Sequence, residues 1–490
     1  MGGSRDVTFL HPPVTLRRLV DEARRARGKT AEYPIAPMGL FSMAAELEDA
    51  GFDVEIVNVA LWKILNPESR VQELLESTEA AIFGIDLHWF THSYGAIQLA
   101  RALKRMYPNS RVILGGYTAS FFSEEIMREF KFVDGVAIGL ADESVVEYAK
   151  YVIRGEGEPY SFIVREGGRV FSKPVKYLEG SIDKYDFTRV HKMREWREYL
   201  RCGPGGYSPS RKPSFWIPIA RGCMYNCSYC GGGVEGFRAA RMGRGLMVRS
   251  PERVAEDVET LTRKYGVRIV NFSHDPEAFG SAYYTKLFSE LRERGIRVSA
   301  YWDSFRIPGR EFISEALRAF ENIILGISLE SVVDEVRFRI GRMYTIEDLR
   351  RAKDYLSDER IGLDIYWCIG MPGETEETAM KIVEVSADLM REFRNAYVVP
   401  PFPYTMDPNA PMALHPEEYG VKKVYKTFKD YYRATSSLKW VDWVAHETET
   451  MSRKLIARTT ERVYSALVDM YRAGLFRENL EHRYFLEHEE

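Results

Sequence analysis

Short apolar runs alternate with amphipathic stretches along the first 150 residues. The apolar runs have the length of buried strands and lie at 7–10, 54–57, 81–85, 112–114 and 136–138. Helical patterns fit near 43–50, 71–79, 94–106 and 123–130. Strands that alternate with helices predict a parallel, doubly wound sheet. Ligands on such a sheet bind at the carboxyl ends of the strands.

A second alternation of strands and helices begins at residue 215. Strand patterns lie at 215–220, 268–273, 297–302, 322–328, 363–369 and 396–400. Helical patterns lie at 251–265, 281–294, 310–320, 346–356 and 376–392. Six such units predict a partial (β/α)6 barrel of TIM type, whose site would lie at the carboxyl ends of its strands.

These patterns divide the chain into four parts and predict an α/β fold. We expect a Rossmann-like domain at 1–150, a connector at 151–214, the partial barrel at 215–420 and a helical C-terminal region at 421–490. The connector is rich in glycine turns and contains a small hairpin near 161–177. The aromatic stretch at 439–443 either lines a substrate site or packs as ordinary core.

Composition narrows the class of protein. The net charge of -3 argues against a protein built mainly to coat nucleic acid, so we expect no nucleic-acid partner. No apolar run has the length of a membrane span, and the N-terminus lacks the architecture of a signal peptide. A cytoplasmic protein is therefore expected. Five cysteines are too few for a disulfide scaffold in a chain of 490 residues.

Three of the five cysteines lie together, directly after the first expected barrel strand. They are spaced C-x3-C-x2-C, at Cys223, Cys227 and Cys230. Such a loop can wrap three thiolates around three irons of a cubane cluster and leave the fourth iron without a protein ligand. The alternative is a structural zinc site, which would need a fourth cysteine or histidine nearby. The nearest histidines on either side are His191 and His274.

The cysteine motif resembles that of the radical S-adenosylmethionine (SAM) superfamily, including the aromatic Tyr229 before the last cysteine. The resemblance implies that Cys223, Cys227 and Cys230 hold a [4Fe-4S] cluster whose open iron binds SAM. It implies reductive cleavage of SAM to a 5′-deoxyadenosyl radical. It also implies an electron donor such as ferredoxin or flavodoxin.

Two further motifs resemble SAM-binding signatures of this superfamily, at 326–331 and, as G-x-P-G-E-T, at 369–375. The resemblance implies SAM contacts from Glu330, Arg342, Gly370, Pro372 and Gly373. Gly231 and Gly232, after the last cysteine, would supply positive-φ turns and contact the cofactor. Ordinary turn chemistry explains such glycines as well. Asp275, after the second expected strand, would orient SAM or bind substrate, unless it is a helix N-cap.

The N-terminal region resembles the cobalamin-binding (B12) subgroup of the superfamily, that of the class B methylases. The similarity rests on His11-Pro12-Pro13 after the first strand, the strand-Gly-Gly step at 112–116 and the turn at 139–143. It implies cobalamin contacts from Asp86, Leu87, His88, Gly115 and Gly116. The cobalt-ligating motif D-x-H-x-x-G is absent. For His88 and His92, a solvated position in a loop explains the residue at least as well as a functional role. A domain that serves only as scaffold is the alternative.

With the barrel, the resemblance covers about residues 6–420. It implies a cobalamin-dependent enzyme that activates an unreactive C–H bond for C-methylation or for C–C bond or ring formation. The substrate, whether small molecule, lipid or peptide, is open. One alternative is a tRNA methylthiotransferase, but no cysteine precedes Cys202 to hold its second cluster. Another is a non-catalytic iron–sulfur protein, with Cys202 or Cys368 as the fourth ligand.

Overall fold

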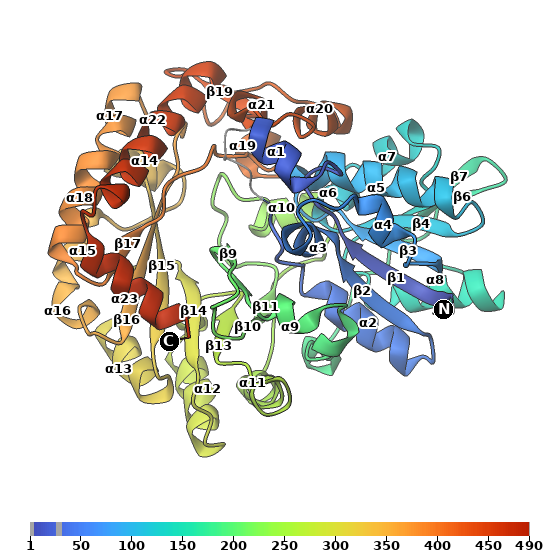
Figure 1. Ribbon diagram of the computed structural model, residues 1–490, viewed down its shortest axis with the longest axis horizontal. Helices are drawn as coiled ribbons and strands as arrows, with labels where there is room; N and C mark the ends of the chain where they lie inside the picture. The colour runs from blue at the N-terminus through green and yellow to red at the C-terminus, as the bar shows by residue number, and fades with distance from the viewer. Residues whose placement is uncertain (1–3, 26–31, 490) are drawn as a thin grey trace.

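The computed structural model describes residues 4–25 and 32–489, which form two β/α halves joined by C-terminal helices (Figure 1). The first half has a seven-stranded sheet in the order β2-β1-β3-β4-β5-β6-β7. Its parallel strands are β1 (Arg5–His11), β2 (Val54–Asn58), β3 (Ala80–Asp86), β4 (Arg111–Gly115) and β5 (Gly135–Ala137). The chain order reverses between β1 and β3, so the carboxyl ends of these two strands flank the switch point at which such sheets bind ligands.

Helices cover both faces of this sheet, which explains why its strands are apolar runs rather than alternating patterns. The helices are α1 (Leu19–Arg25), α2 (Gly39–Asp49), α3 (Val59–Leu65), α4 (Val71–Leu75), α5 (Ser93–Met106), α6 (Tyr117–Phe121), α7 (Ser123–Glu129) and α8 (Ser144–Ala149). The hairpin expected inside the connector is β6 (Phe162–Glu166) and β7 (Arg169–Ser172), and it extends the sheet as two antiparallel edge strands. The sheet is therefore parallel only through β5.

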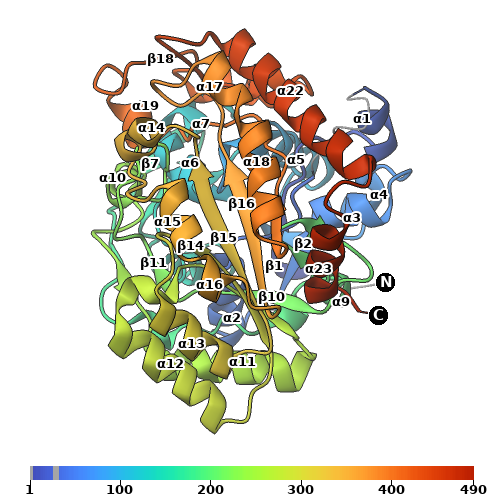
Figure 2. The same cartoon turned by 90° about the vertical axis from the view of Figure 1, so that its left-hand side faces the viewer.

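The second half is a six-stranded parallel sheet in simple chain order, as the sequence predicts for a partial barrel. Its strands are β10 (Ser214–Ile217), β13 (Ile269–Phe272), β14 (Ser299–Ser304), β15 (Ile323–Glu330), β16 (Ile361–Trp367) and β17 (Ala396–Val398). Its helices are α10 (Val234–Ala239), α11 (Pro251–Tyr265), α12 (Ser281–Glu293), α13 (Arg310–Ala319), α14 (Asp334–Arg339), α15 (Ile346–Arg351), α16 (Lys353–Leu356), α17 (Glu376–Met380) and α18 (Ile382–Glu392). Figure 2 shows α15, α16 and α18 beside β15 and β16.

Short elements fill the space around the two sheets. They are α9 (Trp196–Tyr199), the pair β8 (Cys202–Gly203) and β9 (Gly206–Tyr207), and the pair β11 (Ala220–Arg221) and β12 (Met247–Val248). The C-terminal region contains α19 (Pro411–Leu414), β18 (Val421–Lys423), α20 (Phe428–Ala434), α21 (Trp440–Trp443), β19 (His446–Thr448), α22 (Arg453–Arg472) and α23 (Arg477–Glu487). It is thus helical with one antiparallel pair, β18 and β19.

The C-terminal region ties the two halves together. Tyr431 of α20 is buried against Phe90 and Phe122 of the first half, with ring centroids 5.0 and 5.6 Å apart. At the other end, Arg483 of α23 forms a buried bidentate ion pair with Asp364 of β16, at 2.6 and 2.8 Å. No helix of the described residues is long and apolar enough to cross a membrane.

Candidate cofactor site

One cavity of about 560 Å³ lies between the two halves. Its first wall comes from the carboxyl side of the N-terminal sheet and includes His88, Trp89 and the glycines that end β4. Its second wall is the cysteine loop that follows β10. The lining is mainly apolar and aromatic, as is usual for sites that bind large organic cofactors.

The cysteine loop presents all three expected thiols to this cavity. The loop starts at Gly222, whose φ of 80° is readily adopted only by glycine. The backbone N–H of Gly232 donates to Cys230 Sγ at 3.3 Å, and that of Tyr225 donates to Cys223 Sγ at 3.4 Å. Burial raises the pKa of Cys230 to about 12. The thiolate form therefore needs a bound metal to stabilise it.

The spacing of the three sulfur atoms argues against a single zinc ion. Four-coordinate zinc holds thiolates at about 2.3 Å from the metal, so its sulfur ligands lie roughly 3.8 Å apart. The sulfur atoms of Cys223, Cys227 and Cys230 do not all lie within 4.8 Å of one another. A cubane, which spreads its thiolates over three irons, accommodates a wider set. Cys202 and Cys368 do not line the cavity.

A buried ion pair fixes the cysteine loop against the N-terminal half. Arg221, two residues before Cys223, donates from Nη1 and Nη2 to the carboxylate of Asp142 at 2.6 and 2.8 Å. Ser42 of α2 donates to the same carboxylate at 2.5 Å. Bidentate pairs of this kind fix orientation as well as distance. Sequence reasoning placed Asp142 only in a turn and missed its partner.

Glu330, Arg342 and Tyr229 form a second buried network beside the cysteines. Arg342 Nη2 donates to Tyr229 Oη at 2.6 Å, and Tyr229 Oη donates to Glu330 Oε1 at 2.7 Å. Glu330 closes β15 with a φ of 64°, a strained backbone conformation for a residue with a side chain. Arg342 lines the cavity, and its buried Nε has no hydrogen-bond partner among the described residues. The network thus holds the Arg342 side chain in the wall of the cavity.

The glycines after the last cysteine do not supply positive-φ turns, so that expectation was wrong. Gly222 takes this role in the loop, whereas Gly231 and Gly232 keep ordinary backbone angles. A Cβ on Gly231 would lie 2.6 Å from Asn409 Oδ1, so the residue is small because the chain packs closely there. Gly232 lines the cavity, where its predicted cofactor contact stays a prediction.

The G-x-P-G-E-T segment forms a buried turn beside α22. Gly370 and Gly373 have φ of 97° and 92°, and a Cβ on Gly370 would lie 2.8 Å from Ile456 Cγ2. Glu374 Oε2 accepts the Gly370 N–H at 2.8 Å, and burial raises the pKa of Glu374 to about 7. Neither glycine nor Pro372 lines the cavity, so their SAM contacts stay predictions.

Asp275 takes the role of a helix N-cap, the alternative that the sequence left open. Its Oδ1 accepts the Glu277 N–H at 2.9 Å, and its Oδ2 accepts the Phe305 N–H at 3.1 Å. The carboxyl group is buried, which raises its pKa to about 7, and it does not line the cavity. Both oxygens are engaged by backbone, so the local geometry favours the structural role.

The N-terminal wall contains four of the five residues expected to contact cobalamin. Asp86, His88, Gly115 and Gly116 line the cavity, whereas Leu87 is fully buried in the core. Gly116 has a φ of 103°, and a Cβ there would lie 2.9 Å from the Cα of His88. This glycine therefore lets the loops after β3 and β4 touch. Burial lowers the pKa of His88 to about 4, so the imidazole is neutral at physiological pH.

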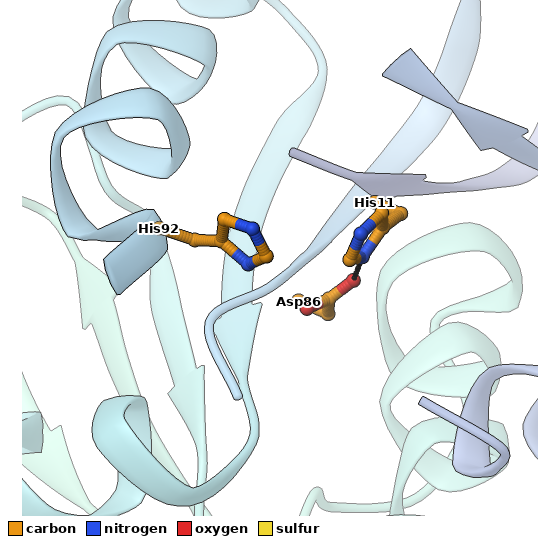
Figure 3. Close-up of side chains that lie close together, drawn as sticks. All are labelled: His11, Asp86 and His92. Carbon is orange, nitrogen blue, oxygen red and sulfur yellow. Dashed lines mark hydrogen bonds and ion pairs between the residues drawn. The ribbon is translucent and has the colours of Figure 1, made fainter. Parts of the chain in front are cut away.

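His92 is a buried residue, which excludes the solvated loop histidine that the sequence left open as one alternative. It ends the short helix η1 (Phe90–His92) and is 1% exposed. Its ring points toward His11 and Asp86 (Figure 3). Burial and then the neighbouring His11 lower the pKa of His92 to about 3. Sequence reasoning used His11 only as part of a motif and did not connect these three residues.

Each wall of the cavity lies in a segment of the chain that matches a known protein-family model. The model of the radical SAM superfamily matches residues 217–385, and that of the B12 binding domain matches residues 24–158. The chain combines a radical SAM domain with a B12-binding domain. The first match contains the cysteine loop, and the second contains the strand ends that face it.

Curated relatives of this chain are distant in sequence. It is 21% identical to an anaerobic magnesium-protoporphyrin IX monomethyl ester cyclase of Rubrivivax gelatinosus, over 75% of this chain and 65% of the relative. It is 22% identical to an uncharacterized methyltransferase of Pyrococcus horikoshii, over 75% and 77%. A probable threonylcarbamoyladenosine tRNA methylthiotransferase of the same organism is 24% identical over 59% and 61%. The chain thus spans less than two thirds of two of these relatives.

A solved structure has the same overall fold. The radical SAM methyltransferase TsrM from Kitasatospora setae, with tryptophan and a SAM analogue bound, aligns with a TM-score of 0.62 at 17% identity. The alignment covers 95% of this chain and 89% of that one. The shared fold therefore includes both β/α halves and the C-terminal helices.

The residues of the cavity fit the three cofactors that these domains imply, namely a [4Fe-4S] cluster, SAM and cobalamin. Three thiols from one loop suit a cluster with one open iron. Arg342 belongs to the same wall, and a guanidinium suits a carboxylate. On the opposite wall, Gly115 and Gly116 line the cavity beside His88 and Trp89, whose flat rings suit contact with a macrocycle.

Proposed function

We propose that this protein activates an unreactive C–H bond of an organic substrate and forms a C–C bond there, by methylation or ring closure. The observation that carries the proposal is the single cavity shared by the cysteine loop and the strand ends of the B12-binding domain. If the B12-binding domain served only as a scaffold, nothing would require the ligand-binding edge of its sheet to face the cysteine loop. The bound cofactors supply a 5′-deoxyadenosyl radical and a methyl-carrying cobalt. The residues of the chain bind and orient these cofactors and exclude water.

The cysteine loop orients the cluster relative to the B12-binding domain. Cys223, Cys227 and Cys230 would each ligate one iron of the cluster, and all three line the cavity. The Arg221–Asp142 pair holds this loop at a fixed distance from the N-terminal strand ends. Because radical chemistry tolerates little misplacement of the reacting groups, we assign the pair a positioning role.

Arg342 would orient SAM through its carboxylate. Tyr229 and Glu330 hold the guanidinium from one side, through hydrogen bonds of 2.6 and 3.4 Å to Nη2. Gly370, Pro372 and Gly373 lie outside the cavity lining, so their contacts with SAM stay predictions.

His88 and Trp89 would lie against the corrin ring on the opposite wall. Their rings pack edge to face at 4.6 Å, and His88 packs in the same way against Tyr117 at 4.8 Å. The imidazole of His88 is held neutral by burial. The apolar and aromatic lining excludes water, which protects a reactive carbon radical from quenching. We expect a reducing partner such as ferredoxin or flavodoxin.

The test uses full-length protein reconstituted without oxygen with iron, sulfide and hydroxocobalamin. The absorption spectrum reports bound corrinoid, and 5′-deoxyadenosine is assayed after SAM and a strong reductant are added. Cys227→Ala should lose cluster-dependent deoxyadenosine while still binding corrinoid. Cys202→Ala is the matched control, because Cys202 is a buried thiol away from the cavity.

Each outcome decides one part of the proposal. Corrinoid binding with cluster-dependent deoxyadenosine supports it and makes the substrate the next question. Deoxyadenosine without bound corrinoid would refute the role given to the B12-binding domain. No deoxyadenosine from a folded, iron-loaded protein would refute the radical step. The methylthiotransferase alternative predicts a second cluster, and hence about eight irons per chain rather than four.

A further inference from the structure

We propose that His11, Asp86 and His92 form a binding site for one divalent transition-metal ion, separate from the iron–sulfur cluster. His11 is the last residue of β1, and Asp86 is the last residue of β3. His92 lies just before α5. The three side chains lie close together (Figure 3), at the point where the order of the sheet reverses. Only Asp86 also lines the cavity.

The donor set and its spacing suit such an ion. One donor atom from each of the three side chains lies within 4.8 Å of the other two, and this is the single group of its kind among the described residues. Two imidazoles and one carboxylate are common ligands of zinc and of non-haem iron. At metal–ligand distances of about 2.0–2.2 Å, the donor atoms move by roughly 1 Å or less to share an ion.

Unused donor atoms are the second observation. His92 is 1% exposed, and within residues 4–25 and 32–489 neither of its ring nitrogens has a hydrogen-bond partner. The buried Oδ1 of Asp86 also has no partner among those residues. Buried polar atoms rarely remain unsatisfied in native proteins. An ion pair between His11 and Asp86 alone leaves these unpaired atoms unexplained. A metal ion held by all three residues would engage the side chains of His92 and Asp86 as well.

The hydrogen bond on the far side of His11 prepares its ring for a metal. His11 Nε2 lies 2.9 Å from the carbonyl oxygen of Tyr33, so Nε2 carries the proton and donates. His11 Nδ1 then faces Asp86 Oδ2 at 2.7 Å with its lone pair available once an ion replaces the shared proton. Metal-bound histidines usually donate their other N–H to a carbonyl or carboxylate in this way.

The ion would fasten the three elements that build one wall of the cavity. β1, β3 and η1 contribute one ligand each, and Asp86 is two residues before His88. The metal is therefore a structural clamp that sets the position of the loop carrying His88. This role does not depend on the reaction proposed above.

The test measures metal content rather than activity. Cluster-reconstituted, full-length protein is equilibrated with Zn²⁺, passed through a desalting column and analysed for zinc and iron. Wild type should retain one zinc per chain beside its four irons. His92→Gln should lose that zinc and bind Zn²⁺ at least tenfold more weakly in a titration, with iron unchanged. His446→Gln, which changes an equally buried histidine elsewhere, should retain zinc.

Two further variants keep the result interpretable. The triple variant Cys223→Ala, Cys227→Ala, Cys230→Ala should lose iron and keep zinc, which separates this site from the cluster. Asp86→Asn tests the same site if His92→Gln does not fold. Wild-type protein that retains no Zn²⁺, Fe²⁺ or Mn²⁺ would overturn the proposal. Equal retention by wild type and by both His92→Gln and Asp86→Asn would also overturn it.

Discussion

Gly116 is the position at which the first wall of the cavity is most sensitive to one added methyl group. A Cβ there would lie 2.9 Å from the Cα and the backbone N of His88, and φ is 103°. With a ψ of −178°, this backbone conformation is essentially restricted to glycine and penalises alanine by about 1–3 kcal/mol. Overpacking against backbone, which cannot rotate away, adds about 1–3 kcal/mol. Gly116→Ala should therefore destabilise the protein by about 2–6 kcal/mol.

Gly115 is the matched control, because it is the preceding residue in the same wall. A Cβ there would have ordinary contact with the Cβ of Ala137 at 3.6 Å, and its φ is not positive. Gly115→Ala should change stability by about 0.5 kcal/mol or less. Urea unfolding of corrinoid-free protein, followed by circular dichroism, measures both variants. Equal stability of Gly116→Ala and wild type would refute the claim that the two loops touch through this glycine.

Three other predictions concern the barrel. Arg483→Met should lower the free energy of unfolding of the protein in urea by about 3–5 kcal/mol, because it leaves Asp364 buried without its bidentate partner. The control Arg477→Met, which changes an exposed arginine, should have little effect. Burial raises the pKa of Glu374 to about 7, so the stability that its protonated form contributes is present below its ordinary pKa and is lost as pH rises through 7. In Glu374→Gln, the free energy of unfolding should therefore fall less than in wild type between about pH 4.5 and 7. An unchanged pH dependence of stability would contradict the raised pKa of Glu374. Tyr229→Phe should weaken SAM binding about tenfold by calorimetry while four irons remain, since it removes the hydroxyl that holds Arg342.

Local patterns were sufficient for most strands, helices and motifs. The apolar run at 322–328 predicts β15, and the helical pattern at 251–265 matches α11 residue for residue. The hairpin at 161–177 was also expected, but not its pairing with β5, because edge pairing depends on where the chain returns in space. The short helices α1, α3, α6 and α8 gave no separate signal, since each has fewer than two full turns of pattern or lies beside an apolar strand.

The cluster cysteines could be predicted because their chemistry depends on local spacing. The roles of Asp275 and Gly231 could not, because each depends on a neighbour that the sequence does not place nearby. Asp275 accepts an N–H from Phe305, and Gly231 is confined by Asn409. A motif therefore indicates that a residue type is needed, but the packing partner decides whether it faces a ligand or supports a loop.

The histidine cluster shows the same limit in terms of topology. His11 and Asp86 are 75 residues apart, and the sequence places each at the end of a strand. Whether two strand ends lie side by side depends on sheet order, and here β1 and β3 are neighbours because β2 lies on the outer side of β1. Had β2 been inserted between them, the strand spacing of nearly 5 Å would have put the two side chains roughly 10 Å apart, too far to share an ion. The reversal of chain order that creates the cofactor cavity therefore also brings together the metal ligands.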